Sequence, residues 1–195
     1  MTPLAITWTL HSHGWASVKV ADDHGEAEAI ASYVSDGPGQ FLYAVTRLVL
    51  GDADTRAELE GEPQVHRWFF HRDGSVVDIR LVLADDDRAP DRSGTVLWSG
   101  SHTVTALARS AVRAFDRMDH EHGEVSYESQ WGRPFPRTEL EVLRTAMRAH
   151  RPDPQSPRAT KIAGKSQGNA KAATTATSSA RSVRQYLGCG RCDRS

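Results

Sequence analysis

Large apolar side chains are almost confined to residues 1–150, and this limit decides how much of the chain can fold. All five tryptophans, all five phenylalanines and three of the four tyrosines lie there, enough for one domain with a hydrophobic core. Residues 151–195 have too few such side chains to offset the entropy lost on ordering them, namely Ile162, Val183, Tyr186 and Leu187. The sequence therefore predicts a single domain over residues 1–150 and a disordered tail over residues 151–195.

Charge divides at the same point. Residues 1–150 contain 15 Lys and Arg against 23 Asp and Glu, whereas residues 151–195 contain nine against two. The two parts carry formal charges of −8 and +7, which the whole-chain value of −1 hides. Such an asymmetry is informative about the partners of a protein.

Apolar and polar residues alternate in several short runs, as is typical of strands with one buried face. The clearest pair of runs flanks Asp73 and Gly74, a dipeptide that suits a type I′ hairpin turn. A third run also alternates, but its alanines and glutamates would suit a helix as well. The polar stretch that ends at Pro63 is predicted to be a loop. The strands predicted in this way cover residues 6–10, 16–20, 27–33, 65–71, 75–83 and 94–99.

A period of 3.6 residues predicts helices in three segments. The first begins after Asp36, which can accept from free backbone N–H groups, and ends at Gly51. Thr103 is the predicted cap of the longest helix, and Thr138 opens a capping-box spacing for the last one. Residues 123–131 are expected to be extended or irregular. The predicted helices cover residues 37–50, 104–118 and 138–150.

The predicted order of elements is β-β-β-α-β-β-β-α-α. Hairpins connect the strands, so we expect an α+β fold: a mostly antiparallel sheet of about six strands with the helices packed on one face. Three strands and a helix occur twice in this order, which would suit a duplicated unit. The two halves share no matching residues at a fixed offset, which argues against duplication.

Histidine is abundant, and all nine histidines lie in residues 1–150. His11 and His13 flank a predicted turn, and His120 and His122 lie among carboxylates at a predicted helix end. These groups suit Zn²⁺, but imidazoles two residues apart point about 200° away from each other on a helix. We therefore predict no metal and no cofactor. A site shared by the two histidine pairs, in a metal-dependent enzyme, is an alternative that stays open.

No catalytic motif is complete in the sequence. Ser101 lacks the flanking glycines of a nucleophile elbow, and residues 159–166 lack the first glycine of a phosphate-binding loop. Cys189 and Cys192 supply half of a tetrathiolate zinc site, and no second pair exists. The sequence thus favours a non-enzymatic protein without excluding an enzyme.

Two groups of residues are candidates for binding a partner. Trp131, Arg133 and Phe135 lie in a proline-containing segment with the composition of interaction anchors. The alternative, which we favour, is that they only fix the last helix to the sheet. Asp78 and Arg80 are predicted to point outward from a central strand.

The basic tail offers a second kind of partner, since its cations could pair with the phosphates of a nucleic acid. No aromatic residues are interleaved with these cations to stack on bases. The sequence also lacks a signal peptide and a run of apolar residues that could span a membrane, so we expect a cytoplasmic protein without membrane contact. The cations in question are Arg158, Lys161, Lys165, Lys171, Arg181, Arg184, Arg191 and Arg194.

Four dispersed segments carry a resemblance to a known group of proteins: Trp8 with His13 to Ala16, Ser32 to Pro38, Glu62 and Pro63 with Arg67 and Trp68, and Tyr127 with Trp131, Phe135 and Pro136. In these segments the sequence resembles the small α+β bacterial proteins grouped with immunity proteins of polymorphic toxin systems. The resemblance implies a protein that binds a cognate toxin and has no catalytic residues. Together with the charge, it predicts a non-enzymatic binding protein whose acidic domain docks on a basic protein.

Overall fold

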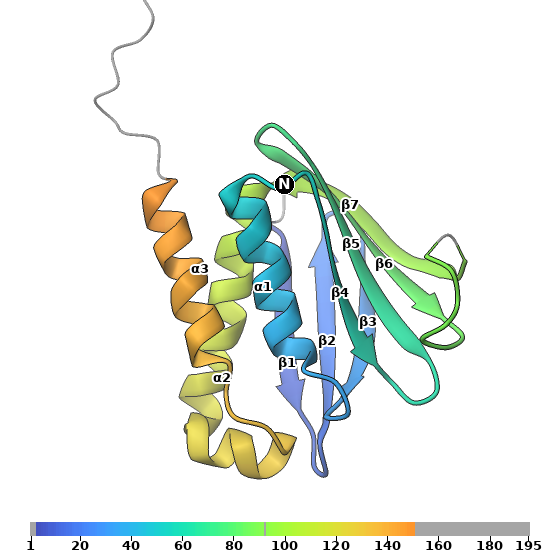
Figure 1. The fold of residues 1–195 in the computed structure, drawn as a ribbon, viewed down its shortest axis with the longest axis vertical. Coiled ribbons are helices and arrows are strands. Elements are labelled where there is room, and N and C mark those ends of the chain that lie inside the picture. Colours follow the sequence, from blue (N-terminus) through green and yellow to red (C-terminus); the bar gives the residue numbers. More distant parts are fainter. Residues whose placement is uncertain (1–2, 92, 151–195) are drawn as a thin grey trace, which may run out of the picture. The chain divides into compact units, whose positions relative to one another are not determined.

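The computed structural model describes residues 3–91 and 93–150, which belong to one compact unit (Met1–Pro154). This part of the chain contains two antiparallel sheets and three helices (Figure 1). The tail predicted over residues 151–195 lies outside the described residues. The elements are β1 (Ala5–Leu10), β2 (Trp15–Asp22), β3 (Gly25–Ser32), α1 (Gly37–Leu50), β4 (Asp54–Glu60), β5 (Val65–Asp73), β6 (Val76–Ala84), β7 (Thr95–Thr103), α2 (Val104–Trp131) and α3 (Arg137–Ala149).

Sheet A is a meander with the order β1-β2-β3. Trp8 pairs with Val18, which in turn pairs with Ala29, so these three side chains share the buried face. The predicted first hairpin and the predicted third strand are both confirmed. Small side chains recur on the buried face of β3, where Ala29 and Ala31 are fully buried. They allow β3 to lie close to β4, β5 and β7 of the second sheet.

Sheet B has the order β4-β5-β6-β7, again with antiparallel neighbours throughout. Trp68, Leu81 and Trp98 lie in register across β5, β6 and β7 and form its buried face. One irregularity, between Leu81 and Val82, shifts the register between β6 and β7.

The predicted hairpin is confirmed, but its turn lies one residue later than predicted: Asp73 pairs with Val76, so Gly74 and Ser75 are the central residues. Only Gly74 has a positive φ (58°), whereas a type I′ turn requires a positive φ at both central residues, so the type I′ turn expected at Asp73 and Gly74 does not form.

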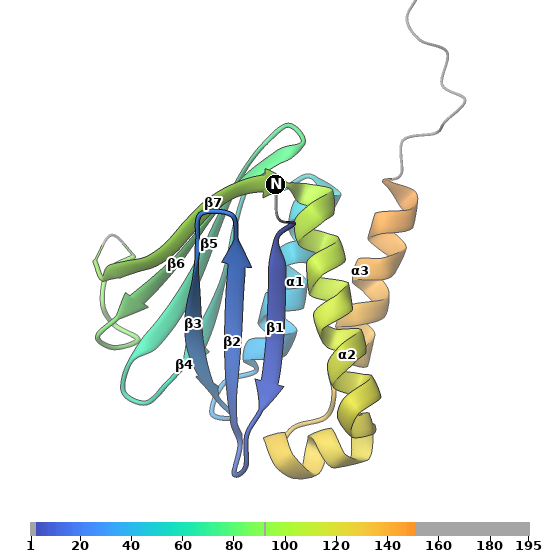
Figure 2. The same ribbon diagram turned by 180° about the vertical axis from the view of Figure 1, so that it is seen from behind.

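The helices form two layers on one side of the sheets (Figures 1 and 2). Helix α1 packs against β4, and α2 packs against β1, while α3 lies on both of these helices. The ends of α1 are those predicted. Asp36 Oδ1 accepts from the Gly39 N–H at 3.2 Å, and the Gly51 N–H donates to the carbonyls of Arg47 and Leu48. No helix in the described residues is long and apolar enough to cross a membrane.

Phe41 of α1 connects the two sheets through aromatic contacts. Its ring centroid lies 6.0 Å from that of Trp8 in sheet A and 5.4 Å from that of Trp68 in sheet B. Trp8 also contacts Phe115 of α2 at 5.4 Å, and Phe41 contacts Phe70 at 6.1 Å. These side chains are buried. Helix α1 therefore fills the angle between the sheets, which bury their apolar faces against it.

A polar contact closes the opposite side of this junction. Asp22 Oδ2 at the end of β2 lies 3.0 Å from His102 Nε2 in β7, and the Asp22 side chain is 1% exposed. Burial alone would raise the pKa of Asp22. Hydrogen bonds from the His24 backbone, His102 and Trp98 outweigh it and hold that pKa below its usual range. The two sheets are thus joined by an ionised carboxylate at neutral pH.

The expectation of one sheet of about six strands is wrong in two respects. The strands form two sheets, and residues 52–63, predicted to be a loop, contain the strand β4. Only Ala57 and Leu59 face the core on β4, between Glu58 and other polar residues. Such a short alternation within an acidic segment is a weak strand signal. The strand is stabilised mainly by its pairing with β5.

Two helix boundaries also differ from the predictions. Residues 124–131 are helical, since α2 continues beyond a break at Gly123 (φ 68°, ψ 159°). The glycine interrupted the apolar period and concealed the second segment. Helix α3 begins at Arg137 with Pro136 at its cap position and no side-chain cap, so the capping box expected at Thr138 does not form.

Phe41→Ala should therefore reduce the free energy of unfolding by about 3–5 kcal/mol, because the cavity would separate helix α1 from both sheets. Phe41→Leu should cost less. Tyr43→Ala, on the exposed side of the same helix, serves as the control and should change stability by less than about 0.5 kcal/mol. Urea unfolding measures all three variants, and equal losses for the two alanine variants would contradict the role assigned to Phe41.

His66 of β5 is buried on the core side of sheet B, and this burial lowers its pKa despite a hydrogen bond to the backbone of Ile30. The folded state therefore binds fewer protons at this site than the unfolded state just below pH 6.5. His71 has the opposite shift, because the Asp54 carboxylate raises the pKa of this exposed imidazole.

The stability contributed by neutral His66 should be present above pH 6.5 and lost as the pH falls below it. Urea unfolding at pH 8 and pH 5.5 should show a smaller acid loss for His66→Gln than for the wild type. His71→Gln should not reduce the acid loss, since protonation of His71 stabilises the folded state. A His66→Gln protein with an unchanged pH profile would contradict this prediction.

Candidate functional site

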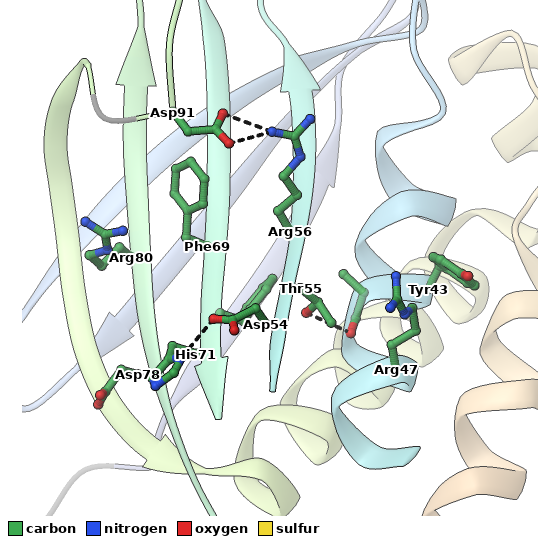
Figure 3. Close-up of a pocket in the computed structure, with 12 residues that line it drawn as sticks. Tyr43, Arg47, Asp54, Thr55, Arg56, Phe69, His71, Asp78, Arg80 and Asp91 are labelled. Atoms are coloured by element: carbon green, nitrogen blue, oxygen red, sulfur yellow. Dashed lines mark hydrogen bonds and ion pairs between the residues drawn. The ribbon is translucent and has the colours of Figure 1, made fainter. Parts of the chain in front are cut away.

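The outer face of sheet B, which points away from the core, carries a hollow of about 420 Å³ (Figure 3). Helix α1 borders it on one side, through Tyr43 and Arg47. We call this concavity the outer-face hollow. The residues that line it are Tyr43, Ala44, Arg47, Asp54, Thr55, Arg56, Phe69, Phe70, His71, Asp78, Arg80 and Asp91.

Strand register places the side chains of the hollow in two rows. Asp54, His71 and Asp78 are paired neighbours across β4, β5 and β6, and form the first row. The second row lies two residues away along the same strands and consists of Arg56, Phe69 and Arg80, which are also paired neighbours. Residues two apart on a strand share a face, so both rows point outward.

Ion pairs hold the polar side chains of the hollow in place. His71 Nδ1 lies 2.7 Å from Asp54 Oδ1, and Arg56 donates to both oxygens of Asp91, at 2.9 and 2.8 Å. These groups are exposed, so solvent screens the pairs and they contribute little to stability. Their effect is mainly to orient donors and acceptors around the hollow.

Aromatic rings form the apolar part of the hollow. Arg80 lies over the Phe69 ring, with its guanidinium carbon 5.4 Å from the ring centroid, and Arg47 lies 5.9 Å from that of Tyr43. Tyr43 is 61% exposed, and Phe69 is half-buried. An aromatic ring flanked by arginine on a solvated face is typical of the central residues of protein interfaces.

A buried arginine shapes the rim beside the hollow. Arg67 of β5 points outward but is only 2% exposed, because residues 85–91 fold over it. Its guanidinium donates to the carbonyls of Ala89 (2.5 Å) and Asp87 (2.8 Å). Glu58 and Asp91 lie 3.8 and 3.7 Å from its nitrogen atoms. Arg67 thus fixes a loop that the sequence alone shows only as a charged connection.

This loop brings two acidic runs to one end of sheet B. Glu60 at the end of β4 pairs with Val65, which pairs with Ala84 at the end of β6. The run Asp85 to Asp87 follows Ala84 directly, and all three of these aspartates are exposed. Glu58, Glu60 and Glu62 therefore share an end of the sheet with them. We call this region, from the end of β4 to the loop at residues 85–91, the acidic end.

Negative charge is concentrated in the strand-containing part of the domain. Residues 104–150, which contain α2 and α3, have seven acidic and seven basic side chains. Residues 52–103, which contain sheet B, have eleven acidic and six basic side chains. One of those six cations is the buried Arg67. The field outside sheet B is thus more negative than the field outside the helices.

The predicted binding residues separate into two groups. Asp78 and Arg80 are exposed and line the outer-face hollow. Trp131 and Phe135 lie in the hydrophobic core, 0% and 6% exposed, so they are not available to anchor a partner. Arg133 donates to the carbonyls of Tyr33 (2.7 Å) and its neighbour (2.9 Å). The segment therefore has a structural role, but not the predicted one: Arg133 fixes the end of α2 to the turn after β3, rather than the last helix to the sheet.

The candidate metal ligands are dispersed. His11 Nε2 lies 3.1 Å from a serine hydroxyl on β2, His122 contacts Gln130, and His13 and His120 are exposed. Within residues 3–91 and 93–150, no group of three or more His, Cys, Asp or Glu side chains could hold a metal ion. The two cysteines lie outside this part of the chain.

Sequence reasoning missed Phe69, Arg67 and Tyr43. An outward-facing phenylalanine at position 69 was detectable, because it alternates with the core residues Trp68 and Phe70. The burial of Arg67 by a loop twenty residues away had no signal in the sequence.

No protein-family model matches this chain, and comparison with curated proteins and with solved structures finds none that is significantly similar.

Removal of the Arg67 guanidinium should loosen the loop at residues 85–91. Arg67→Met should lower the free energy of unfolding by about 1.5–3 kcal/mol, because carbonyls that now accept from a charged donor lose it. Amide hydrogen exchange should increase in the loop. Lys19→Gln, which breaks an exposed ion pair with Glu26 in sheet A, is the control: it should leave exchange in the loop unchanged and cost less than about 1 kcal/mol. Unchanged exchange in Arg67→Met would show that the loop is held by other contacts.

Proposed function

We propose that this protein is a non-enzymatic binding protein that presents the outer face of sheet B to a basic protein partner. Phe69 and Arg80 would form the centre of the interface, and the acidic end would contact cations of the partner. The observation that carries the proposal is the continuity of these two features: Asp91 both lines the hollow and belongs to the loop that carries the acidic run.

The chemistry of this face suits reversible protein recognition. Buried aromatic and arginine side chains supply most of the affinity at protein interfaces, while charges at the rim steer the encounter. The ion pairs at Asp54 and Asp91 hold the polar groups in defined positions before binding. A partner would then bind without ordering these side chains, which saves entropy.

The resemblance to immunity proteins supports the same kind of function. Such proteins block a toxin by binding it, and the face proposed here would act by covering a cationic surface of its partner. Nucleic-acid binding by residues 151–195 is the alternative, and it falls on residues outside the described part of the chain. Because the resemblance implies a cognate toxin, the product of the adjacent gene is the first candidate partner to test.

The partner can be identified by site-specific cross-linking in the cells that produce the protein. A photo-reactive aromatic residue in place of Tyr43, which is exposed and lines the hollow outside its proposed centre, should capture one basic protein, and the purified pair should bind more weakly as salt concentration rises. The same residue at position 113, exposed on α2, is the matched control. Capture of one protein from both positions, or of none from position 43, would contradict the proposal.

Once the partner is identified, Phe69→Ala and Arg80→Ala should each weaken binding by at least about tenfold, as central interface residues do. Asp85→Lys with Asp87→Lys should mainly slow association and flatten its salt dependence. Glu121→Lys on α2 is the control for a change of charge elsewhere. Stopped-flow binding at several salt concentrations separates these effects. A loss of affinity in Glu121→Lys equal to that in the Asp85 and Asp87 variant would refute the placement of the interface.

A further inference from the structure

A second concavity, of about 480 Å³, lies at the end of the domain opposite the acidic end. It is enclosed by the end of α1, the β5–β6 turn, the start of α2 and the last turns of α3, which come together in Figure 1. We call it the arginine groove. The residues that line it are Val49, Arg72, Ser75, Val104, Thr105, Ala108, Arg109, Val112, Arg144, Met147, Arg148 and His150.

The arginine groove has an apolar floor. Val49, Val104 and Ala108 are buried at its base, and Val112 and Met147 are half-buried in its walls. Its volume lies within the range of about 300–1,000 Å³ that is common for small-molecule sites. A ligand with an apolar body would remove this floor from water.

The charged side chains that line the groove are all arginines. There are four of them, His150 adds an imidazole, and none of the lining residues is acidic. Arg144 is paired with Asp116 and Glu141, and Arg72 donates to the carbonyls of Leu48 and Gly74.

Three of the four arginines form no ion pair with any carboxylate in residues 3–91 and 93–150, although the domain has an excess of acidic side chains: Arg72, Arg109 and Arg148. Arg72 is engaged by backbone carbonyls, and Arg148 donates to the Thr145 hydroxyl at 2.8 Å. Arg109 and Arg148 therefore keep donors that a ligand could use. The first residues of α2 add the partial positive charge of a helix N-terminus to the same wall.

An apolar floor and an uncompensated cationic rim are complementary to one class of ligand. We propose that the arginine groove binds an anionic amphiphile, a molecule with a single apolar chain and a carboxylate or phosphate head group. The chain would cover the floor between α2 and α3. The head group would accept hydrogen bonds from Arg109 and Arg148, which can present two donors each to an oxyanion.

The segment that follows His150 is not complementary to the groove. Residues 151–195 carry nine basic and two acidic side chains, the same sign of charge as the groove itself. The arginine groove is also separate from the outer-face hollow, since the two share no lining residue. Binding in one is therefore independent of the function proposed for the other.

Calorimetric titration of the full chain tests this proposal with decanoate and decyl phosphate below their micelle concentrations. We expect saturable binding of one molecule of at least one of them, and the preferred head group identifies the ligand chemistry. Decyl glucoside, decyltrimethylammonium, acetate and inorganic phosphate should bind at least about tenfold more weakly, because each lacks either the anionic head or the chain. Equal binding of the neutral or cationic chains would overturn the anionic assignment.

Variants locate the site. Arg109→Gln with Arg148→Gln should weaken binding about tenfold or more, since two charge-assisted contacts are lost. Met147→Trp, which fills the groove, should abolish it. Arg113→Gln, one turn from Arg109 and outside the groove, should bind as the wild type does. Circular dichroism and thermal unfolding confirm that each variant is folded.

Three results would overturn the proposal: no binding of either amphiphile by the full chain, equal binding by the double variant, or unchanged binding by Met147→Trp. Binding would also be absent if another part of the chain or a second copy of it filled the groove, and in that case too the proposal would be wrong. None of these outcomes affects partner capture at position 43, so the two proposals fail separately.

Discussion

The domain depends on the packing of one helix between two sheets. Neither sheet can bury its apolar face against the other alone, because the strands of sheet B diverge from those of sheet A (Figure 2). Phe41 fills the resulting angle and contacts a tryptophan of each sheet. Small side chains on β3 and the Asp22–His102 pair then close the side where the sheets approach directly. In the described residues no helix covers the outer face of sheet B, because all three helices pack on the core side.

This arrangement separates charge along the strands of sheet B. β5 and β6 run from the acidic end to the turn at Gly74, a distance of about 25 Å for nine-residue strands. The loop at residues 85–91 provides carboxylates at one end. Arg72, the start of α2 and the last turns of α3 provide cations at the other end. Two ligands of opposite charge can therefore approach the domain without competing, and each is repelled from the wrong end.

Local patterns predicted most elements but not how they assemble. The hairpins at Gly14 and Gly74 and the limits of helix α1 depend on near neighbours in the sequence, so alternation and turn residues sufficed to place them. The division into two sheets depends on long-range packing around Phe41, which leaves no periodic signal. β4 was missed for a related reason, since its pairing with β5 outweighs an acidic composition that favours a loop.

The site shows the same limit more sharply, because arginines in similar sequence surroundings have different roles in the structure. Arg67 and Arg109 are both single cations within alternating or periodic segments, and nothing nearby in the sequence distinguishes them. Burial distinguishes them. Arg67 is covered by the loop and donates to its carbonyls, so its charge stabilises the position of that loop. Arg109 stands exposed beside an apolar floor with no carboxylate paired to it in the described residues. A folded domain gains no stability from holding like charges together around such a floor, so their placement there is better explained by a ligand than by the fold.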